Sequence, residues 1–365
     1  METDISAGSK LKAMKRREFG RALAAVATSV SLAPKGAAAE GEAGSITDVQ
    51  GVKVGHFTES RRPTGCTVLL FEKGATAGVD VRGGEPGTRE TDLLNPVNTV
   101  QQIQAIFLAG GSAFGLDVAS GVMRYLEEHR LGFAMGDIIV PVVPGAILYD
   151  LELGDAKVRP TAESGYKACQ AATTERVPEG NIGAGAGAAI GKMFGMKQAM
   201  KSGLGSASIR VGDTGIVVGA IVAVNAVGDV IDPKTGQIIA GARNADGSGF
   251  MDSMARIREG YGVRADGANT TIGVVATNVA LDKAQATKVA QMAHDGLART
   301  IYPVHTPSDG DTIFAVATGA NSARANPGAI GALAADVMAR AVLRAVINAR
   351  GIAGLPSYGD LRSRG

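Results

Sequence analysis

Two neighbouring hydroxyl residues, Thr270 and Thr271, stand where a polar stretch of this 365-residue sequence meets an apolar one. Residues 244–269 are rich in Gly, Asp and Arg and indicate a long surface segment, whereas residues 271–277 indicate a buried strand. A hydroxyl at such a junction can serve as a nucleophile when a nearby group accepts its proton. By itself a threonine at a strand start is an ordinary β-former, and residues 269–271 (NTT) also match a glycosylation sequon. The chemistry therefore depends on which other residues lie nearby.

A pair of carboxylates, Asp309 and Asp311, precedes another apolar run. If the backbone is extended there, residues two apart point to the same side, and paired carboxylates can orient and polarise a hydroxyl or an amine. The alternatives are an Asp-Gly turn or a calcium-binding loop. The sequence lacks a complete EF-hand loop, because no Asp stands two residues before Asp309 and no Glu closes the loop. These carboxylates are candidate partners for the threonine hydroxyl.

The elements that must position these residues alternate along the chain. Apolar runs, several of them β-branched, predict strands, and apolar residues that repeat every three to four positions predict helices. The predicted strands are residues 46–56, 67–71, 216–224, 271–277 and 312–318. The predicted helices are residues 112–130, 162–173, 283–302 and 327–350. Ser112 is expected to cap the first helix, whose apolar face would include Phe114. Strands alternating with helices, some strands buried on both faces, predict a layered α/β sandwich.

The composition limits the possible partners. Lys and Arg total 37 and Asp and Glu total 35, so the overall charge indicates neither a nucleic-acid groove nor an acidic partner. A small uncharged or zwitterionic substrate fits better. The only cysteines, Cys66 and Cys169, have no C-x-x-C partner and no nearby histidine, so the sequence favours neither a metal site nor a catalytic thiol. A disulfide between them is the less favoured alternative. We expect no cofactor.

A glycine-rich run, residues 183–188 (GAGAGA), loosely matches the dinucleotide fingerprint G-x-G-x-x-A. Its context does not fit, because the preceding residues 175–179 are charged and contain a proline instead of forming an apolar strand. Close approach of the backbone beside a site explains these glycines better.

The first 39 residues are typical of an export leader. Residues 15–19 (KRREF) precede an apolar stretch at residues 22–33, and the three alanines at 37–39 suit a signal peptidase. The pattern resembles a twin-arginine signal, which predicts a periplasmic or exported protein; the alternative is a disordered basic leader. The apolar stretch is too short and too rich in alanine to span a bilayer stably, so we expect no stable membrane insertion.

Six short motifs resemble, in their order along the chain, those of one hydrolase family, which contains the L-aminopeptidase/D-esterase, the β-peptidyl aminopeptidases and the nylon-oligomer hydrolase. The resemblance covers residues 46–350, although each motif alone would be weak. It implies a four-layer αββα sandwich like that of ornithine acetyltransferase. It also implies one hydrolase domain that cuts itself into two parts, residues 40–269 and 270–365. The motifs are residues 64–67 (TGCT), 108–116 (LAGGSAFGL), 180–185 (GNIGAG), 224–229 (VNAVGD), 269–271 (NTT) and 309–312 (DGDT).

The same resemblance implies roles for individual residues. It implies self-cleavage between Asn269 and Thr270, after which Thr270 is a new N-terminus and the nucleophile. The freed α-amine can accept the hydroxyl proton, since its pKa of about 8 lies nearer neutrality than the value of about 10.4 for lysine. Asn225 is implied to face the developing negative oxygen, and loss of such a donor commonly costs about 3 kcal/mol in the transition state. Asp309 and Asp311 are implied to orient the nucleophile and its amine.

Two further residues gain meaning only from the resemblance. Lys192 is implied to hold the nucleophile or the carboxylates by its charge, and Tyr149 to lie near the substrate cleft; taken alone, they would be a solvated lysine and a packed aromatic. A threonine with two aspartates is closer to the nylon-oligomer hydrolase than to the β-peptidyl aminopeptidases, many of which have Ser and a Ser/Glu pair.

The substrate therefore stays open between removal of an N-terminal residue and endo-cleavage of a linear amide. The expected partners are a small peptide or amide and further copies of the cleaved chain in a homo-oligomer. The alternatives are acyl transfer, as in ornithine acetyltransferase, and a non-enzymatic binding role, which predicts an intact chain.

Overall fold

Strands and helices alternate through the part of the chain that the computed structural model describes, namely residues 44–262, 269–324, 326–352 and 354–362. The expected leader, residues 1–39, lies outside the described residues, as do residues 263–268 just before Asn269. Residues 43–365 form one unit, to which the following description refers.

One long strand, β2 (Gly65–Val81), connects the two halves of a nine-stranded sheet. The first half of β2 pairs antiparallel with β1 (Lys53–Thr58) and β4 (Ile103–Ala109), and its second half pairs antiparallel with β16 (Thr312–Asn321). The strand order is β10-β11-β14-β16-β2-β4-β7-β3, with β1 also on β2. The other members are β3 (Thr88–Arg89), β7 (Gly145–Ile147), β10 (Leu204–Arg210), β11 (Val217–Asn225) and β14 (Thr270–Val279).

The two halves of the sheet face each other across a shared apolar core. Leu69 and Leu108 enter this core from one half, and Ile272 and Phe314 enter it from the other. All four side chains are fully buried. Because consecutive strand residues point to opposite faces, the outward-facing apolar residues of each half need a cover of their own.

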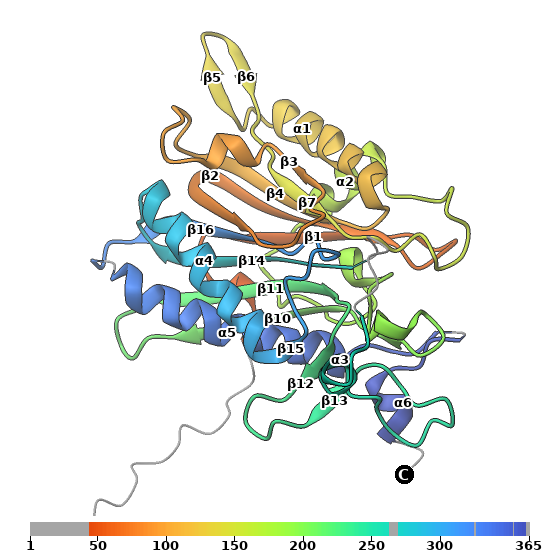
Figure 1. Ribbon diagram of the computed structural model, residues 1–365. Helices are drawn as coiled ribbons and strands as arrows, with labels where there is room; N and C mark the ends of the chain where they lie inside the picture. The colour runs from red at the N-terminus through yellow and green to blue at the C-terminus, as the bar shows by residue number, and fades with distance from the viewer. Residues whose placement is uncertain (1–43, 263–268, 325, 353, 363–365) are drawn as a thin grey trace, which may run out of the picture. The chain divides into compact units, whose positions relative to one another are not determined.

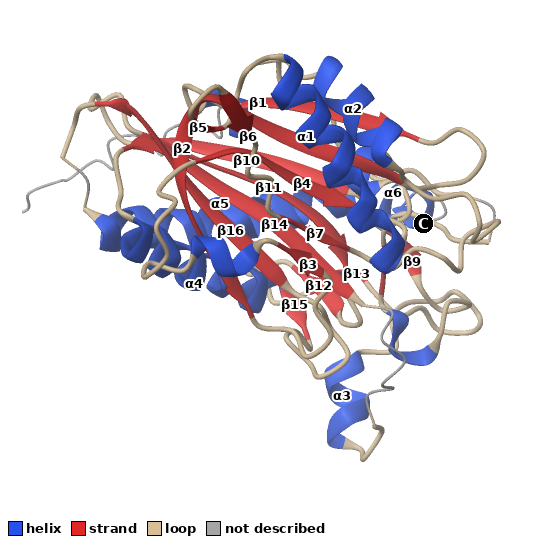
Figure 2. Cartoon of the chain, turned by 90° about the horizontal axis from the view of Figure 1, so that it is seen from above, coloured by secondary structure: helices blue, strands red, loops and turns tan. Residues whose placement is uncertain are grey.

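Helices provide that cover on both sides (Figure 1). α1 (Val118–Glu128) and α2 (Ala162–Gln170) pack on the half that contains β4, and α4 (Lys283–Thr300) and α5 (Pro327–Ile347) pack on the half that contains β14. In the view turned by 90° (Figure 2), α1 and α2 lie nearest the viewer and α4 and α5 lie behind the strands. The expected four-layer αββα sandwich is confirmed.

The helix starts on the second face follow local signals. The Asp282 carboxylate accepts a hydrogen bond from Gln285 N at 2.8 Å and so caps α4. Asn326 caps α5 by accepting from Ala329 N at 3.1 Å, and Pro327 occupies the first turn, where it costs no hydrogen bond.

Smaller elements surround the sandwich. The short strands are β5 (Phe133–Met135), β6 (Ile138–Val140), β8 (Ala189–Ile190), β9 (Met200–Lys201), β12 (Asp229–Ile231), β13 (Ile238–Ala240) and β15 (Ile301–Tyr302). The short helices are α3 (Ser253–Arg258) and α6 (Tyr358–Arg362). In the described residues, none of the helices combines the length and apolar character needed to cross a bilayer.

The predicted strand at residues 46–56 was too long at its start. Residues Ile46–Asp48 form a 3₁₀ helix, and β1 begins only at Lys53. The Asp48 carboxylate accepts Ser45 N at 3.0 Å, and Ile46 N donates to Ser206 Oγ at 2.9 Å. A local cap and a distant side chain thus take the backbone groups that a ladder would have used.

The predicted helix at residues 112–130 was wrong in its first turn. Residues Ser112–Asp117 form a 3₁₀ helix, and α1 starts at Val118. Ser112 has a φ of 54°, which is left-handed, so it is not the predicted cap. Phe114 is 57% exposed, under the Arg159 guanidinium at 3.7 Å from the ring centre, so it does not belong to the helix's apolar face.

Two other helix ends also differ from expectation. α2 ends at Gln170 because Thr173 pairs with Val54, and residues 301–302 leave α4 to form β15. The polar segment 244–269 contains α3. Cys66 and Cys169 are both buried as free thiols, so they form no disulfide.

Candidate active site

Thr270 is the first residue of β14, and strand pairing brings its neighbours to it. Antiparallel β11 places Asn225 opposite Thr270, and a parallel bridge on the other side joins Asn269 to Asp309. Thr270 and Asn269 are each only 4% exposed. The ladders therefore gather residues from three separate sequence motifs at one end of adjacent strands.

The carbonyl oxygen of Asn269 accepts two hydrogen bonds, one from a side chain and one from the backbone. Thr270 Oγ1 donates to this oxygen, and Gly310 N donates to it at 2.9 Å. A Cβ atom on Gly310 would lie 2.8 Å from Thr270 Oγ1 and 2.7 Å from Glu85 O. Position 310 therefore requires glycine, because any side chain would displace the threonine hydroxyl or the neighbouring backbone.

The Asp311 carboxylate accepts a hydrogen bond from the backbone one residue after Thr270. Its Oδ1 accepts Thr271 N at 2.7 Å, and its Oδ2 accepts His305 N at 3.1 Å and His305 Nδ1 at 2.8 Å. Asp311 is 1% exposed, so these donors replace the water that it gave up. His305 has a φ of 57°, an uncommon backbone state that the surrounding contacts must maintain.

Asp309 is held by a different set of donors. Its Oδ2 accepts Thr306 N at 2.9 Å and Thr306 Oγ1 at 2.6 Å. Burial, together with the nearby charge of Asp311, raises the pKa of Asp309 to about 6. One of the two predicted carboxylates thus changes charge near neutral pH.

Lys192 begins a short 3₁₀ helix after Gly191 and is partly buried. Burial lowers the pKa of this lysine to about 7, although the carboxylates of Asp309 and Glu152 oppose the shift. An amine that is partly neutral at physiological pH can exchange protons, unlike a solvated lysine.

Asn225 is buried and oriented at both ends of its carboxamide. Its Oδ1 accepts Ala189 N at 3.0 Å, and its Nδ2 donates to Tyr149 O at 2.9 Å. This amide thus holds the backbone of Tyr149 beside Asn225.

A shallow pocket adjoins Asn225, and its enclosed space of about 10 Å³ has room for roughly one water molecule. Its lining includes three residues that the sequence singled out, Tyr149, Lys192 and Asn225, and also the acidic residue Glu152. The rest of its lining consists of Asp150, Leu153, Gly187, Ala189 and Met196. Polar groups of both charges beside apolar walls mark this place as one end of a candidate substrate site.

A buried ion pair holds the Tyr149 side of the pocket. Arg62 donates to the Asp150 carboxylate and also to Asp150 O, and both side chains are almost completely buried. Asp150 further accepts Thr64 Oγ1 at 2.6 Å and Gly111 N at 2.9 Å. The carboxylate is therefore satisfied without water, as a buried charge must be.

A buried lysine, Lys201, holds the glycine-rich loop on the other side. Its Nζ donates to Gly185 O at 3.1 Å and to Ala188 O at 3.0 Å, and also to Ser202 O. These bonds fix the loop that presents Ala189 N to Asn225.

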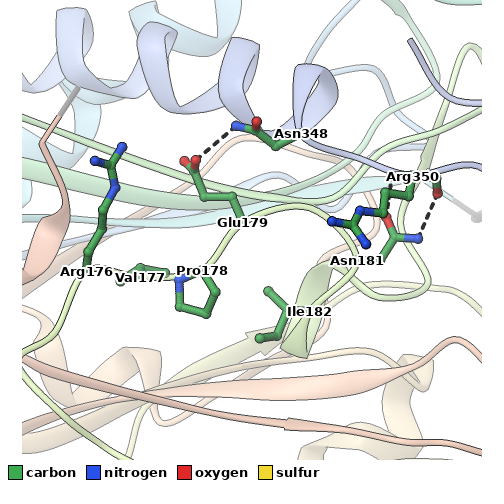
Figure 3. A pocket seen from close by; sticks show the side chains of 8 residues that line it. All are labelled: Arg176, Val177, Pro178, Glu179, Asn181, Ile182, Asn348 and Arg350. Carbon is green, nitrogen blue, oxygen red and sulfur yellow. Dashed lines mark hydrogen bonds between the residues drawn. The ribbon is translucent and has the colours of Figure 1, made fainter. Parts of the chain in front are cut away.

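A larger pocket lies elsewhere and does not contain the predicted site residues (Figure 3). Its acidic residue, Glu179, is held by Arg344 Nε at 2.7 Å and by Asn348 Nδ2 at 2.9 Å. Across the same pocket, Asn181 Nδ2 donates to Arg350 O at 2.8 Å, and Arg350 N donates to Asn181 Oδ1 at 3.0 Å. In the part of the chain described here, no three His, Cys, Asp or Glu side chains are grouped so that they could hold a metal ion.

Sequence reasoning missed three residues that support the site: His305, Lys201 and Arg62. His305 stands in the segment that contains both aspartates, so its proximity was a usable signal. For Lys201 and Arg62 the sequence holds no such signal, because their hydrogen-bond partners lie in loops whose positions depend on the tertiary fold.

The chain is similar to curated proteins along most of its length. It is 45% identical over 344 residues to an uncharacterized aminopeptidase of Mycobacterium tuberculosis, a match that covers 87% of this chain and 97% of the relative. It is 33% identical over 316 residues to a 6-aminohexanoate-oligomer endohydrolase of Paenarthrobacter ureafaciens, covering 82% of this chain and 84% of that protein.

Solved structures share the fold. A Burkholderia sp. beta-aminopeptidase matches with a TM-score of 0.65 at 23% identity, over 88% of this chain and 94% of that one. The L-aminopeptidase D-ala-esterase/amidase of Ochrobactrum anthropi, described as a variant of the Ntn hydrolase fold, matches with a TM-score of 0.65 at 21% identity and the same coverage. The model of peptidase family S58 matches residues 44–357. With nearly all of its described residues inside that match, the chain belongs to peptidase family S58.

Proposed function

We propose that this peptidase is made as a precursor that cuts its own backbone between Asn269 and Thr270. Thr270 then acts as the N-terminal nucleophile of an amide hydrolase. One observation carries the proposal: the Thr270 hydroxyl and the Gly310 amide both donate to the Asn269 carbonyl oxygen, at a buried peptide bond. A nucleophile and a second donor at one carbonyl are the groups that acyl transfer needs.

Self-cleavage would proceed as an N-to-O acyl shift. Thr270 Oγ attacks the carbonyl carbon of Asn269, the carbonyl oxygen takes up the electron pair, and the hydroxyl proton passes to the Thr270 nitrogen as that nitrogen leaves. The Asn269 acyl group is then an ester on Oγ. Water hydrolyses this ester to the Asn269 carboxylic acid and restores the hydroxyl. In the precursor Thr270 has no free α-amine. Asp309, which pairs with Asn269, titrates near neutrality, as does Lys192, whose charge acts on Asp309.

Substrate hydrolysis would use the groups that cleavage creates. The new α-amine of Thr270, with a pKa of about 8, accepts the hydroxyl proton as Oγ attacks the substrate carbonyl. The proton is passed on to the leaving amine, an acyl-enzyme forms on Oγ, and water releases the acid. Asn225 Nδ2, next to the pocket, would donate to the developing oxyanion once it leaves Tyr149 O.

The substrate we favour is a small peptide or linear amide with a free amino end. Of the two acidic residues that line the pocket, Asp150 is paired with Arg62, and the exposed Glu152 offers a negative charge for an ammonium group. The aminopeptidase relatives fit this choice, while the 6-aminohexanoate-oligomer endohydrolase keeps endo-cleavage as the alternative. Acyl transfer to an amine, as in ornithine acetyltransferase, would appear as exchange between acetyl-ornithine and glutamate that is faster than peptide hydrolysis.

Intact mass and N-terminal sequencing test the central claim. The wild type is expected to give two fragments, one of which begins Thr-Thr-Ile-Gly at Thr270. Thr270→Ala is expected to stay whole and inactive, and Thr270→Ser to cut and retain activity. A folded wild type without fragments, or a Thr270→Ala variant that is still cut there, would refute the mechanism.

We also propose that the leader at residues 1–39 directs export and is removed, and that the cleaved units assemble into a homo-oligomer. The first proposal rests on the arginine pair and alanines of residues 15–39, and the second on the resemblance to the family. Sequencing of the first N-terminus after expression in a bacterium that exports twin-arginine substrates tests removal. Light scattering tests assembly against the 37.0 kDa of the single chain.

A further inference from the structure

We propose that the backbone N–H of Gly310 is the oxyanion donor of the self-cleavage step. The inference rests on the proposed self-cleavage and names a catalytic group for it. Gly310 N lies 2.9 Å from the Asn269 carbonyl oxygen, which becomes the negatively charged oxygen when Thr270 Oγ attacks.

The position of this donor follows from strand pairing. β14 and β16 run parallel, with Ile272 opposite Thr312, and the bridge between Asn269 and Asp309 extends that ladder to the scissile bond. The Gly310 hydrogen bond is therefore the first rung of a sheet. An ordinary rung would serve structure only; this one ends on the carbonyl that the neighbouring hydroxyl also contacts.

The residue type supports a role in chemistry. A Cβ atom at position 310 would lie 2.8 Å from Thr270 Oγ1 and 3.3 Å from Thr270 Cγ2. Gly310 has no left-handed φ, so backbone conformation does not explain the glycine. Glycine is needed here because a Cβ atom would clash with both the reacting threonine and Glu85 O, so the donor reaches the scissile carbonyl only without a side chain.

The donor is also held rigidly. Asp309 N, one residue earlier, donates to Thr306 O at 3.1 Å, and Glu85 N donates to Asp309 O at 2.9 Å. On the other side of Gly310, Arg82 N donates to Asp311 O at 3.0 Å. A donor fixed before the reaction stabilises developing charge without reorganisation, which is the condition for a large effect on rate.

An amide-to-ester change at Gly310 tests the proposal. Cell-free translation of the full chain with glycolic acid at position 310 removes the N–H and keeps the shape of the backbone. Self-cleavage at Asn269, followed by intact mass over time at neutral pH, is expected to slow about 100-fold to 1000-fold. Hydrolysis of the new ester itself would give fragments of a different mass, so the two cuts are separable.

The matched control is the same ester change at Glu85, with the α-hydroxy analogue of glutamic acid. It removes a backbone hydrogen bond to the same loop, at Asp309 O, but none to the scissile carbonyl. This control is expected to cleave close to the wild-type rate, and thermal unfolding of both esters checks that the fold is kept.

The outcomes separate this inference from the function it rests on. If the wild type does not cut itself between Asn269 and Thr270, the proposed function fails. If the wild type cuts and the Gly310 ester cuts as fast as the Glu85 ester, self-cleavage stands and the Gly310 assignment is overturned. A slow Gly310 ester beside a fast Glu85 ester supports it.

Discussion

His305 Nδ1 donates a hydrogen bond of 2.8 Å to Asp311 Oδ2, while the other oxygen of that carboxylate holds Thr271 N at 2.7 Å. The carboxylate thus connects a histidine to the backbone one residue beyond the proposed nucleophile. The His305 ring in turn packs edge-on against the buried His294 ring, with centres 4.8 Å apart. We infer that His305 positions Asp311, and through it the start of β14.

Replacing His305 should slow self-cleavage when the donor is lost, and much less when a donor is kept. Gly and Asn both tolerate the left-handed φ of this position, so the pair is matched for backbone strain. His305→Gly removes the charge-assisted hydrogen bond and is expected to slow the step about 10-fold to 100-fold. His305→Asn keeps an amide donor near Nδ1. Mass spectrometry over time gives both rates, and equal rates for the two variants would contradict a positioning role.

The rate of self-cleavage should fall as the pH drops through about 6. The pKa of Asp309 is raised to about 6 by burial and by Asp311, and the ionised form accepts both donors of Thr306. The acid limb should disappear in Asp309→Asn, which should be slow at every pH. Rates measured from pH 5 to 8 decide this, and a wild-type rate that stays flat from pH 5 to 7 would exclude Asp309 as the titrating group.

The raised pKa of Asp309 affects stability in the opposite direction: the rate of self-cleavage should rise with pH, whereas the stability of the fold should fall. Because the folded pKa of Asp309 lies above its ordinary value of 3.8, the folded state holds the proton more tightly, and this contribution to stability is lost as the pH rises through about 6. In a Thr270→Ala background, which keeps the chain uncut, the pH dependence between 4 and 6 should be smaller for Asp309→Asn.

Lys192→Met should raise the melting temperature of the uncut Thr270→Ala chain at pH 7. In the chain with Thr270 intact, the same change removes a buried amine that can exchange protons near neutral pH, so it should abolish self-cleavage. Burial lowers the pKa of Lys192 to about 7, so the folded state binds this proton less tightly than the unfolded chain between pH 7 and 10.5, and stability rises with pH in that window. Methionine removes that cost. Lys197→Met, at an exposed lysine nearby, is the control and should change neither property. A Lys192→Met chain that melts lower, or that still cuts itself, would refute the assignment.

Removing Arg62 should destabilise the fold strongly. Arg62→Met leaves the Asp150 carboxylate buried without its cation, which commonly costs about 3–5 kcal/mol. Lys53→Met breaks the exposed pair with Glu72, which is worth about 0–1 kcal/mol. Urea unfolding of both variants in the Thr270→Ala background compares the two costs, and similar losses would show that the buried pair is not structurally important.

Glu152→Gln should separate exo- from endo-cleavage. If Glu152 attracts a substrate ammonium group, the variant should raise KM for peptides with a free amino end and leave KM for N-acetylated amides unchanged. Because Glu152 is exposed, the expected change is modest, about 2-fold to 5-fold. Steady-state kinetics on matched free and acetylated substrates measure it. An equal effect on both substrates would favour an endo-amidase.

Much of the sandwich was readable from local sequence. β11, β14 and β16 follow from continuous runs of apolar and β-branched residues, since such runs suit strands that are buried on both faces. α5 begins where Pro327 predicts a first turn. Thr270 was singled out because polarity changes abruptly at a strand start, and the order of the motifs then supplied its expected partners.

Tertiary structure decided what those residues touch. Register placed Asn225 opposite Thr270 and Gly310 N on the Asn269 carbonyl, and neither pairing follows from local propensity. Residues 46–48 left the predicted strand because Ser206, 160 positions away, takes the Ile46 amide. Hydrogen bonds between distant segments depend on how the layers pack, so only the folded chain turns a threonine at a strand start into a candidate nucleophile with two carboxylates, a histidine and a rigid donor around it.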